Sequence, residues 1–118
     1  MALSQILDLT TDYNNGKLAT IEIGGYDYAI VQLVNPSAAV TFKTSNDANA
    51  IEGASDGNAS TAINFTDVQG INLASGSGAT SLAATGLIRF NYIGRFLRLD
   101  GAGTAVCDKV IVRLFKIN

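Results

Sequence analysis

Residues Thr85 to Leu99 read TGLIRFNYIGRFLRL, and the alternation of their side chains decides the fold. Before Gly94, large apolar side chains share one face of an extended chain: Ile88, Phe90 and Tyr92. The side chains between them share the other face: Leu87, Arg89 and Asn91. Beyond Gly94, Leu97 and Leu99 alternate with Phe96 and Arg98. A period of two residues is typical of a strand with one buried face, so this stretch predicts two short strands joined at Gly94.

Similar extended runs flank this stretch. They are expected over residues 17–23, 26–34, 39–44, 61–73 and 110–117. Turn residues separate the runs, and Asn15-Gly16 is the strongest hairpin signal among them because both residues tolerate positive φ. The last run is apolar on both faces, which predicts a strand that is central in its sheet or covered on both sides.

About eight short, mainly antiparallel strands with no convincing helix predict an all-β protein, a single β-sandwich or jelly-roll domain over residues 13–118. Residues 1–12 precede this domain as an N-terminal arm, which we expect to form a turn of helix or an edge strand. Its apolar side chains are candidates for contact with a neighbouring molecule: Leu3, Ile6 and Leu7.

The composition favours a chain that packs against others. Only 15% of the 118 residues are charged and 47% are hydrophobic, whereas about a quarter charged is usual for a free-standing domain. The chain has one proline, so its sheet edges carry little protection against pairing, which favours a homo-oligomer. The alternative is an ordinary β-rich domain whose surface is made of Ser, Thr, Asn and Gly.

Charge is unevenly distributed along the chain. Residues 1–85 hold two basic and eight acidic residues, whereas residues 86–118 hold six basic and two acidic residues. The basic residues are spaced through predicted strands and form no dense run, which argues against binding to nucleic acid. Complementary packing within the fold or between subunits is the better interpretation.

The residues that most enzymes and metal sites need are absent. The chain has no histidine and one cysteine, Cys107, so neither a histidine-based nucleophile nor a zinc site is expected. Residues 53–57 match the G-x-S-x-G pattern, but they lie in a polar loop without a histidine base. The acidic and amide residues of 47–58 do not fit the register of a calcium-binding loop. We therefore expect no enzyme activity, no metal and no cofactor.

Two further expectations concern location and ligands. No signal peptide and no apolar run of membrane-spanning length is visible. We therefore expect that the protein does not associate with a membrane and that it is made in a reducing cytoplasm. Tyrosines on strands can form a platform for sugars, which keeps carbohydrate binding as the alternative function. The tyrosines available for it are Tyr13, Tyr26, Tyr28 and Tyr92.

Three segments resemble small virion proteins of tailed bacteriophages. YAIVQLVNPSAAVTFKTSNDAN and ATGLIRFNYIGRFLRLDG resemble two strand-and-turn segments of these modules, and KVIVRLFKIN resembles their last strand. Together these segments cover residues 26–49 and 85–118, roughly half of the chain. The chain departs from the pattern after residue 47, where a polar loop, residues 48–60, replaces a common aromatic residue.

The resemblance implies a β-sandwich or jelly roll and a structural role: capsid decoration (cement) protein, head-fibre part or tail-associated module. The most specific role that the resemblance implies is that of a decoration protein, which binds the major capsid protein on the outside of the icosahedral head. A homotrimer is the favoured oligomer. The alternative is a carbohydrate-binding module of a head fibre or tail protein that attaches to host glycans. If the chain has this role, two alternatives are open for Arg89, Arg95 and Arg98. They either contact acidic surfaces of a neighbouring subunit or pair with acidic residues of their own chain.

Overall fold

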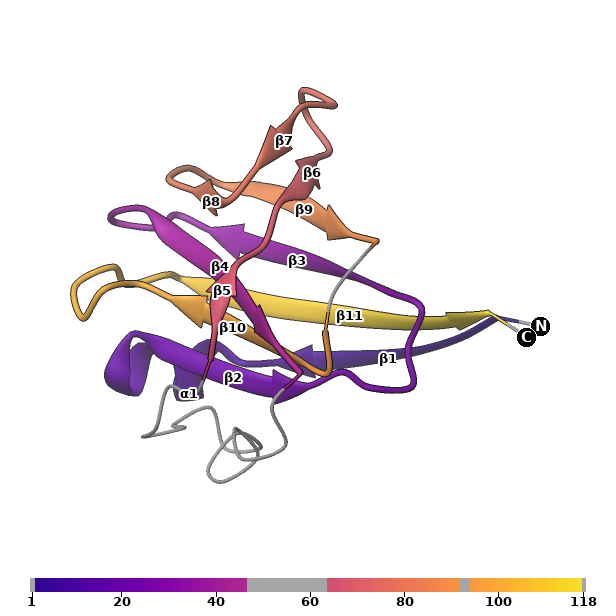
Figure 1. The fold of residues 1–118 in the computed structure, drawn as a ribbon. Helices are drawn as coiled ribbons and strands as arrows, with labels where there is room; N and C mark the ends of the chain where they lie inside the picture. The colour runs from indigo at the N-terminus through magenta and orange to yellow at the C-terminus, as the bar shows by residue number, and fades with distance from the viewer. Residues whose placement is uncertain (1, 47–63, 92–93, 118) are drawn as a thin grey trace.

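Two antiparallel sheets packed face to face make up the fold, which confirms the all-β sandwich (Figure 1). The computed structural model describes residues 2–46, 64–91 and 94–117. One sheet has the order β1 (Ala2–Asp8), β11 (Lys109–Ile117), β3 (Tyr28–Val34), β9 (Gly86–Phe90), β6 (Gly70–Asn72) and β7 (Gly78–Ala79). The other has the order β2 (Leu18–Glu22), β10 (Phe96–Asp100), β4 (Val40–Ser45) and β5 (Thr66–Asp67), and β8 (Ser81–Leu82) also pairs with β4.

The two strands predicted around Gly94 are β9 and β10, and they belong to opposite sheets. Ile88 and Phe90 of β9 are fully buried, as are Leu97 and Leu99 of β10. The end of β9 at Phe90 and the start of β10 at Phe96 therefore lie in different layers of the sandwich, and both strands direct their apolar face into the same core. Tyr92 and the polar connection predicted after Ser45 lie outside the described residues, apart from Asn46.

The core lies between the two sheets and contains an aromatic pair that joins them. Phe42 of β4 and Phe90 of β9 are both fully buried, and their ring centroids lie 5.1 Å apart in an edge-to-face arrangement. Such a pair adds specific geometry to the burial of two large side chains. Ala19, Ile21 and Ile23, which alternate along the run predicted over residues 17–23, are all buried as well.

The run over residues 61–73 is divided into two short strands, β5 and β6, in different sheets. The second begins at Gly70, which lies directly against the core. A side chain there would bring its Cβ to 2.7 Å from Ile88 and 2.8 Å from Phe90. This position therefore accepts only glycine without displacement of the two buried residues of β9.

The hairpin turn predicted at Asn15-Gly16 is wrong. These residues end a short helix, α1 (Thr10–Gly16), and Lys17 follows in the left-handed conformation with its N–H bonded to the carbonyl of Tyr13. The helix forms because Tyr13 is drawn into the core, where it is fully buried. Tertiary packing thus overrides a local turn signal, and the prediction of no helix is corrected by this one.

The N-terminal segment is part of the sandwich rather than a separate arm. β1 pairs with β11 from Ala2↔Ile117 to Asp8↔Ile111 and forms an edge strand, which is one of the two forms expected for residues 1–12. Leu7 packs against the core and Leu9 is buried in it, and these contacts fix the N-terminal segment to the sandwich. Ala2 and Ile117 pair at the end of the β1–β11 ribbon, so the described chain begins and ends at the same place (Figure 1).

β11 is central in its sheet, between β1 and β3, as predicted. Its inner face is buried through Val110, Val112 and Leu114. Its outer face is not covered by the described chain: Ile111 and Phe115 are partly exposed, and Ile117 is 62% exposed. The strand therefore carries apolar residues on a face that residues 2–46, 64–91 and 94–117 leave uncovered.

Tyr13 gives a testable dependence of stability on pH. Its hydroxyl donates a hydrogen bond to the carbonyl of Ala105 at 2.9 Å, and burial raises the pKa of this hydroxyl above its ordinary value of about 10. The folded chain keeps this proton at a pH where the unfolded chain loses it, so the stabilisation is complete below about pH 10 and falls above it. We expect urea denaturation to show this loss between about pH 10 and about pH 12 in the wild type and a smaller one in Tyr13→Phe. An equal loss in both would contradict the assignment to Tyr13.

Candidate functional site

The outer face of the six-stranded sheet is the main unexplained feature of the fold. In the described ranges, six large hydrophobic side chains are exposed, and all but Val106 lie on or beside this face. The five on the face are Ile6, Ile71, Leu73, Leu87 and Ile117. Scattered exposed apolar residues are normal, but a contiguous group on one face is typical of an interaction surface.

Strand register builds this face as rows across the sheet. The central row runs Ile6, Arg113, Ile30, Arg89, Ile71, one residue from each of β1, β11, β3, β9 and β6. Isoleucine and arginine therefore alternate across five neighbouring strands. Side chains of one row point to the same side of a sheet, so the row presents an apolar surface interrupted by two positive charges.

A shallow hollow of about 330 Å³ lies on this face. Its lining contains no acidic residue: Ile6, Ile30, Gln32, Leu73, Leu87, Ile111, Arg113 and Phe115. Leu73 follows β6, and its N–H donates to the carbonyl of Leu87, which brings the two leucines to one side of the hollow. The hollow is therefore an apolar depression with a basic residue in its wall.

The guanidinium groups of the two arginines of the face lie over aromatic rings. Tyr28 and Phe115 stack with centroids 4.4 Å apart and ring planes 10° from parallel. The Arg89 Cζ lies 4.0 Å from the Tyr28 centroid, and the Arg113 Cζ lies 4.6 Å from the Phe115 centroid. This stack across β9, β3 and β11 lowers the cost of placing guanidinium groups on an apolar surface, and leaves donor groups available to a partner's carboxylates.

The predicted contact residues divide between this face and other places. Ile6 is 65% exposed and Arg89 lies in the same row, so two of the six candidates come together on the outer face. Leu7 is directed inward and packs against the core. Leu3 lies in β1 opposite Lys116.

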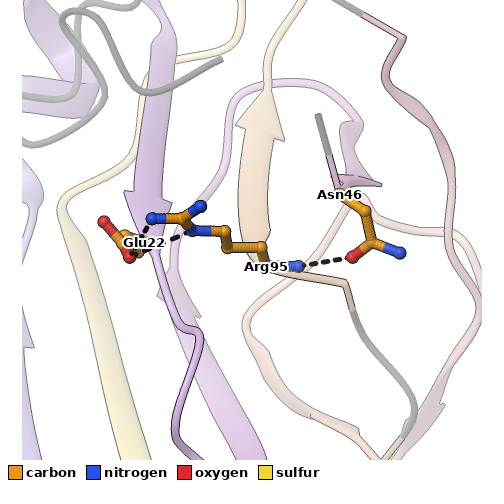
Figure 2. Close-up of polar contacts among 3 residues, drawn as sticks. All are labelled: Glu22, Asn46 and Arg95. Atoms are coloured by element: carbon orange, nitrogen blue, oxygen red, sulfur yellow. Dashed lines mark hydrogen bonds and ion pairs between the residues drawn. The ribbon is translucent and has the colours of Figure 1, made fainter. Parts of the chain in front are cut away.

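Arg95 is engaged with its own chain, as Figure 2 shows. Its Nε and Nη2 donate to Glu22 Oε1 at 3.2 and 3.1 Å, and its backbone N–H donates to Asn46 Oδ1 at 2.9 Å. These contacts connect the start of β10 to β2 and to the end of β4. Arg95 therefore follows the second alternative, in which an arginine pairs with an acidic residue of its own chain. An exposed ion pair of this kind adds little to the free energy of unfolding.

Arg98 is corrected from a surface contact to an internal residue. It is 3% exposed, its Nε donates to Thr20 Oγ1 at 2.8 Å, and its Cζ lies 3.8 Å from the Phe65 centroid. Burial lowers the pKa of its guanidinium, and the charge of Asp100 opposes this shift. The sequence pattern placed Arg98 on the outer face of β10 correctly, but Phe65 packs over that position.

Some residues of the outer face had no place among the predicted contacts. They are Phe115, Ile111, Arg113 and Ile30, which lie in the strands predicted over residues 26–34 and 110–117. The signal that points to them is the apolar character of both faces of residues 110–117. That pattern predicts a strand that is central or covered on both sides; β11 is central, and the described residues cover its inner face but not its outer face.

Tyrosines form no common platform in the described part of the chain. Tyr13 is buried, and Tyr28 lies in the aromatic stack. Tyr26 is partly exposed beside a second, more polar hollow and donates a hydrogen bond to Gln5 Oε1. That hollow is lined by Ser4, Gln5, Gly24, Gly25, Tyr26 and Lys116.

No group of three or more metal-ligating side chains is found among residues 2–46, 64–91 and 94–117. In the same ranges no helix is long and apolar enough to cross a membrane.

Among known proteins, this chain has a structural match but no sequence match. No protein-family model and no curated protein sequence matches the chain. The crystal structure of SPBc2 prophage-derived protein YomS is similar to this chain, with a TM-score of 0.60 and 11% sequence identity over 98% of this chain and 93% of YomS. The two chains therefore share one β-sandwich fold over nearly their whole lengths.

Proposed function

We propose that this chain is a non-enzymatic structural protein of a tailed-bacteriophage virion, and that it decorates the capsid by binding through the outer face of its six-stranded sheet. The observation that carries the proposal is the group of exposed apolar side chains on that face, with Leu87 and Leu73 beside the hollow. The fold shared with a prophage-derived protein supports the phage context.

The chemistry of the face defines the surface that it fits. Burial of its apolar side chains supplies the non-directional part of the binding energy. Arg89 and Arg113, held on Tyr28 and Phe115, supply contacts to carboxylates of the partner. The proposed partner is the major capsid protein on the outside of the icosahedral head, and the chain is made in the host cytoplasm before assembly. This mode of binding calls for no cofactor, metal, nucleic acid or membrane.

A second candidate function is attachment to host glycans as part of a head fibre or tail. The observation that favours it is the polar hollow beside Tyr26, where an aromatic ring lies next to the Gln5 amide and a lysine. Specific binding on a glycan array that is lost in Tyr26→Ala would support this candidate over decoration. An array without specific binding would remove it.

The two candidates differ in copy number within the particle. We expect quantitative mass spectrometry of purified virions from the encoding phage to find about as many copies of this chain as of the major capsid protein, because decoration proteins cover the shell surface. A content of only a few per cent of that value would contradict decoration and favour a fibre or tail. Absence from purified virions would contradict both.

A further inference from the structure

β1 is an edge strand without the usual protection. Among the described residues, the six-stranded sheet ends at β1, and no strand pairs with its second edge. Its seven residues, ALSQILD, contain neither proline nor lysine, and the one charged residue, Asp8, is at the end. Soluble proteins usually blunt such an edge with proline, lysine or a bulge, because its free backbone groups pair with other strands.

Hydrogen bonding to β11 shows which backbone groups remain for the open edge. The N–H of Leu9 donates to the carbonyl of Val110 at 2.8 Å. In an antiparallel pair, residues directed toward the partner alternate with residues directed away from it. Leu7 and Gln5 therefore also bond to β11, while Ser4, Ile6 and Asp8 direct their N–H and C=O groups to the open edge.

We propose that β1 pairs antiparallel with β1 of a second copy of this chain about a two-fold axis. A register centred on Gln5 pairs Ser4 with Ile6 and Ala2 with Asp8, and it is the register that pairs all seven residues of the strand. The residues that face the open edge then form the hydrogen-bonded pairs, and Gln5 meets Gln5 in a non-hydrogen-bonded pair.

The charges and the exposed residues of β1 are compatible with pairing to β1 of a second copy. In the Gln5-centred register Asp8 lies opposite Ala2, so the two aspartates are about 20 Å apart, at opposite ends of the paired strands. Ser4, Gln5 and Ile6 are all exposed in the single chain, and Ile6 is 65% exposed. Like charges therefore stay separated, while the exposed centre of the strand becomes covered.

Pairing of this kind joins the two six-stranded sheets into one. The Ile6 side chains of the two copies then lie diagonally across the junction on the same side of the sheet, within about 7–8 Å. The apolar outer faces of the two copies become continuous through this contact. The inference rests on the edge of β1 and not on the proposed function, and it predicts a two-fold pair where the sequence resemblance favoured a trimer.

Proline at position 4 tests the backbone pairing. Its ring removes the N–H that Ser4 directs to the open edge and leaves the bonds of β1 to β11 in place. The matched control is Ser4→Val, which changes the same side chain and keeps the N–H. By sedimentation equilibrium we expect the wild type and Ser4→Val to have twice the chain mass of 12.3 kDa, and the dimer dissociation constant of Ser4→Pro to be raised at least about tenfold. A wild type that stays monomeric, a trimer, or a Ser4→Pro dimer as tight as that of Ser4→Val would overturn the proposal.

A cysteine cross-link tests the register, and it decides the proposal if Ser4→Pro does not fold. In the Gln5-centred register the two Gln5 Cα atoms lie about 4.5 Å apart, within the span of a disulfide, whereas the two Ser4 Cα atoms are more than about 7 Å apart and outside it. Under mild oxidation Gln5→Cys is expected to form a covalent dimer, and Ser4→Cys is expected to stay reduced. The wild type is the background control, because its Cys107 is buried. Cross-linking of Ser4→Cys alone, or of neither variant, would contradict this pairing.

Discussion

Replacement of Phe90 by alanine is expected to lower the free energy of unfolding by about 3–5 kcal/mol. Phe90 is fully buried, and its ring packs edge-to-face on Phe42 from the opposite sheet. The truncation leaves a cavity at the contact between the two layers, and Gly70 beside it has no side chain to fill the space. The loss comes from apolar transfer, from the cavity and from the aromatic pair together.

The matched control is Leu87→Ala, three residues earlier on the same strand. Leu87 is 39% exposed on the outer face, so its truncation is expected to cost about 1 kcal/mol or less. Urea denaturation followed by circular dichroism measures both variants against the wild type. Equal losses in the two variants would contradict the division of β9 into a core face and a free outer face.

Replacement of Leu87 by aspartate is expected to weaken binding to the capsid by roughly thirtyfold or more. Leu87 lies in the wall of the apolar hollow, where the proposed contact covers it. A carboxylate that becomes buried there must lose its hydration, and this costs about 2 kcal/mol or more in the bound state. In the free chain the same side chain remains in water, so the variant is expected to fold like the wild type.

Val106→Asp is the control for this experiment. Val106 is 43% exposed, close to the 39% of Leu87, but it does not belong to the outer face. Binding of each purified chain to decoration-free shells gives the two affinities. The proposal is contradicted if both aspartate variants bind as well as the wild type, or if Val106→Asp loses binding and Leu87→Asp does not.

The fold was largely predictable because two-residue alternation records burial directly. Ala19, Ile21, Ile88 and Phe90 point inward as the pattern predicts. The exception is α1, where Asn15-Gly16 carries a local turn signal but burial of Tyr13 decides the conformation. A short-range pattern does not contain that contact, because Tyr13 bonds to Ala105, 92 positions away.

The candidate site was predictable only in part. Alternation assigns Arg89 and Arg98 each to the face of a strand that lies away from the core, and both assignments agree with the structure. It does not tell which outer face another segment covers: Phe65 covers Arg98, whereas the described chain leaves the row of Ile6, Arg113 and Ile30 open. The aromatic stack of Tyr28 and Phe115 depends on strand register across β3 and β11, which no single strand encodes.

Hydroxyl-radical footprinting of the free chain and of intact virions tests most directly whether the outer face is the binding surface. The measured quantity is the oxidation of individual side chains, read by mass spectrometry. Leu73, Leu87 and Phe115 are expected to lose most of their reactivity in the virion, whereas Val106 keeps the reactivity that it has in the free chain. Outer-face side chains that are oxidised equally in both states would contradict the proposed binding surface.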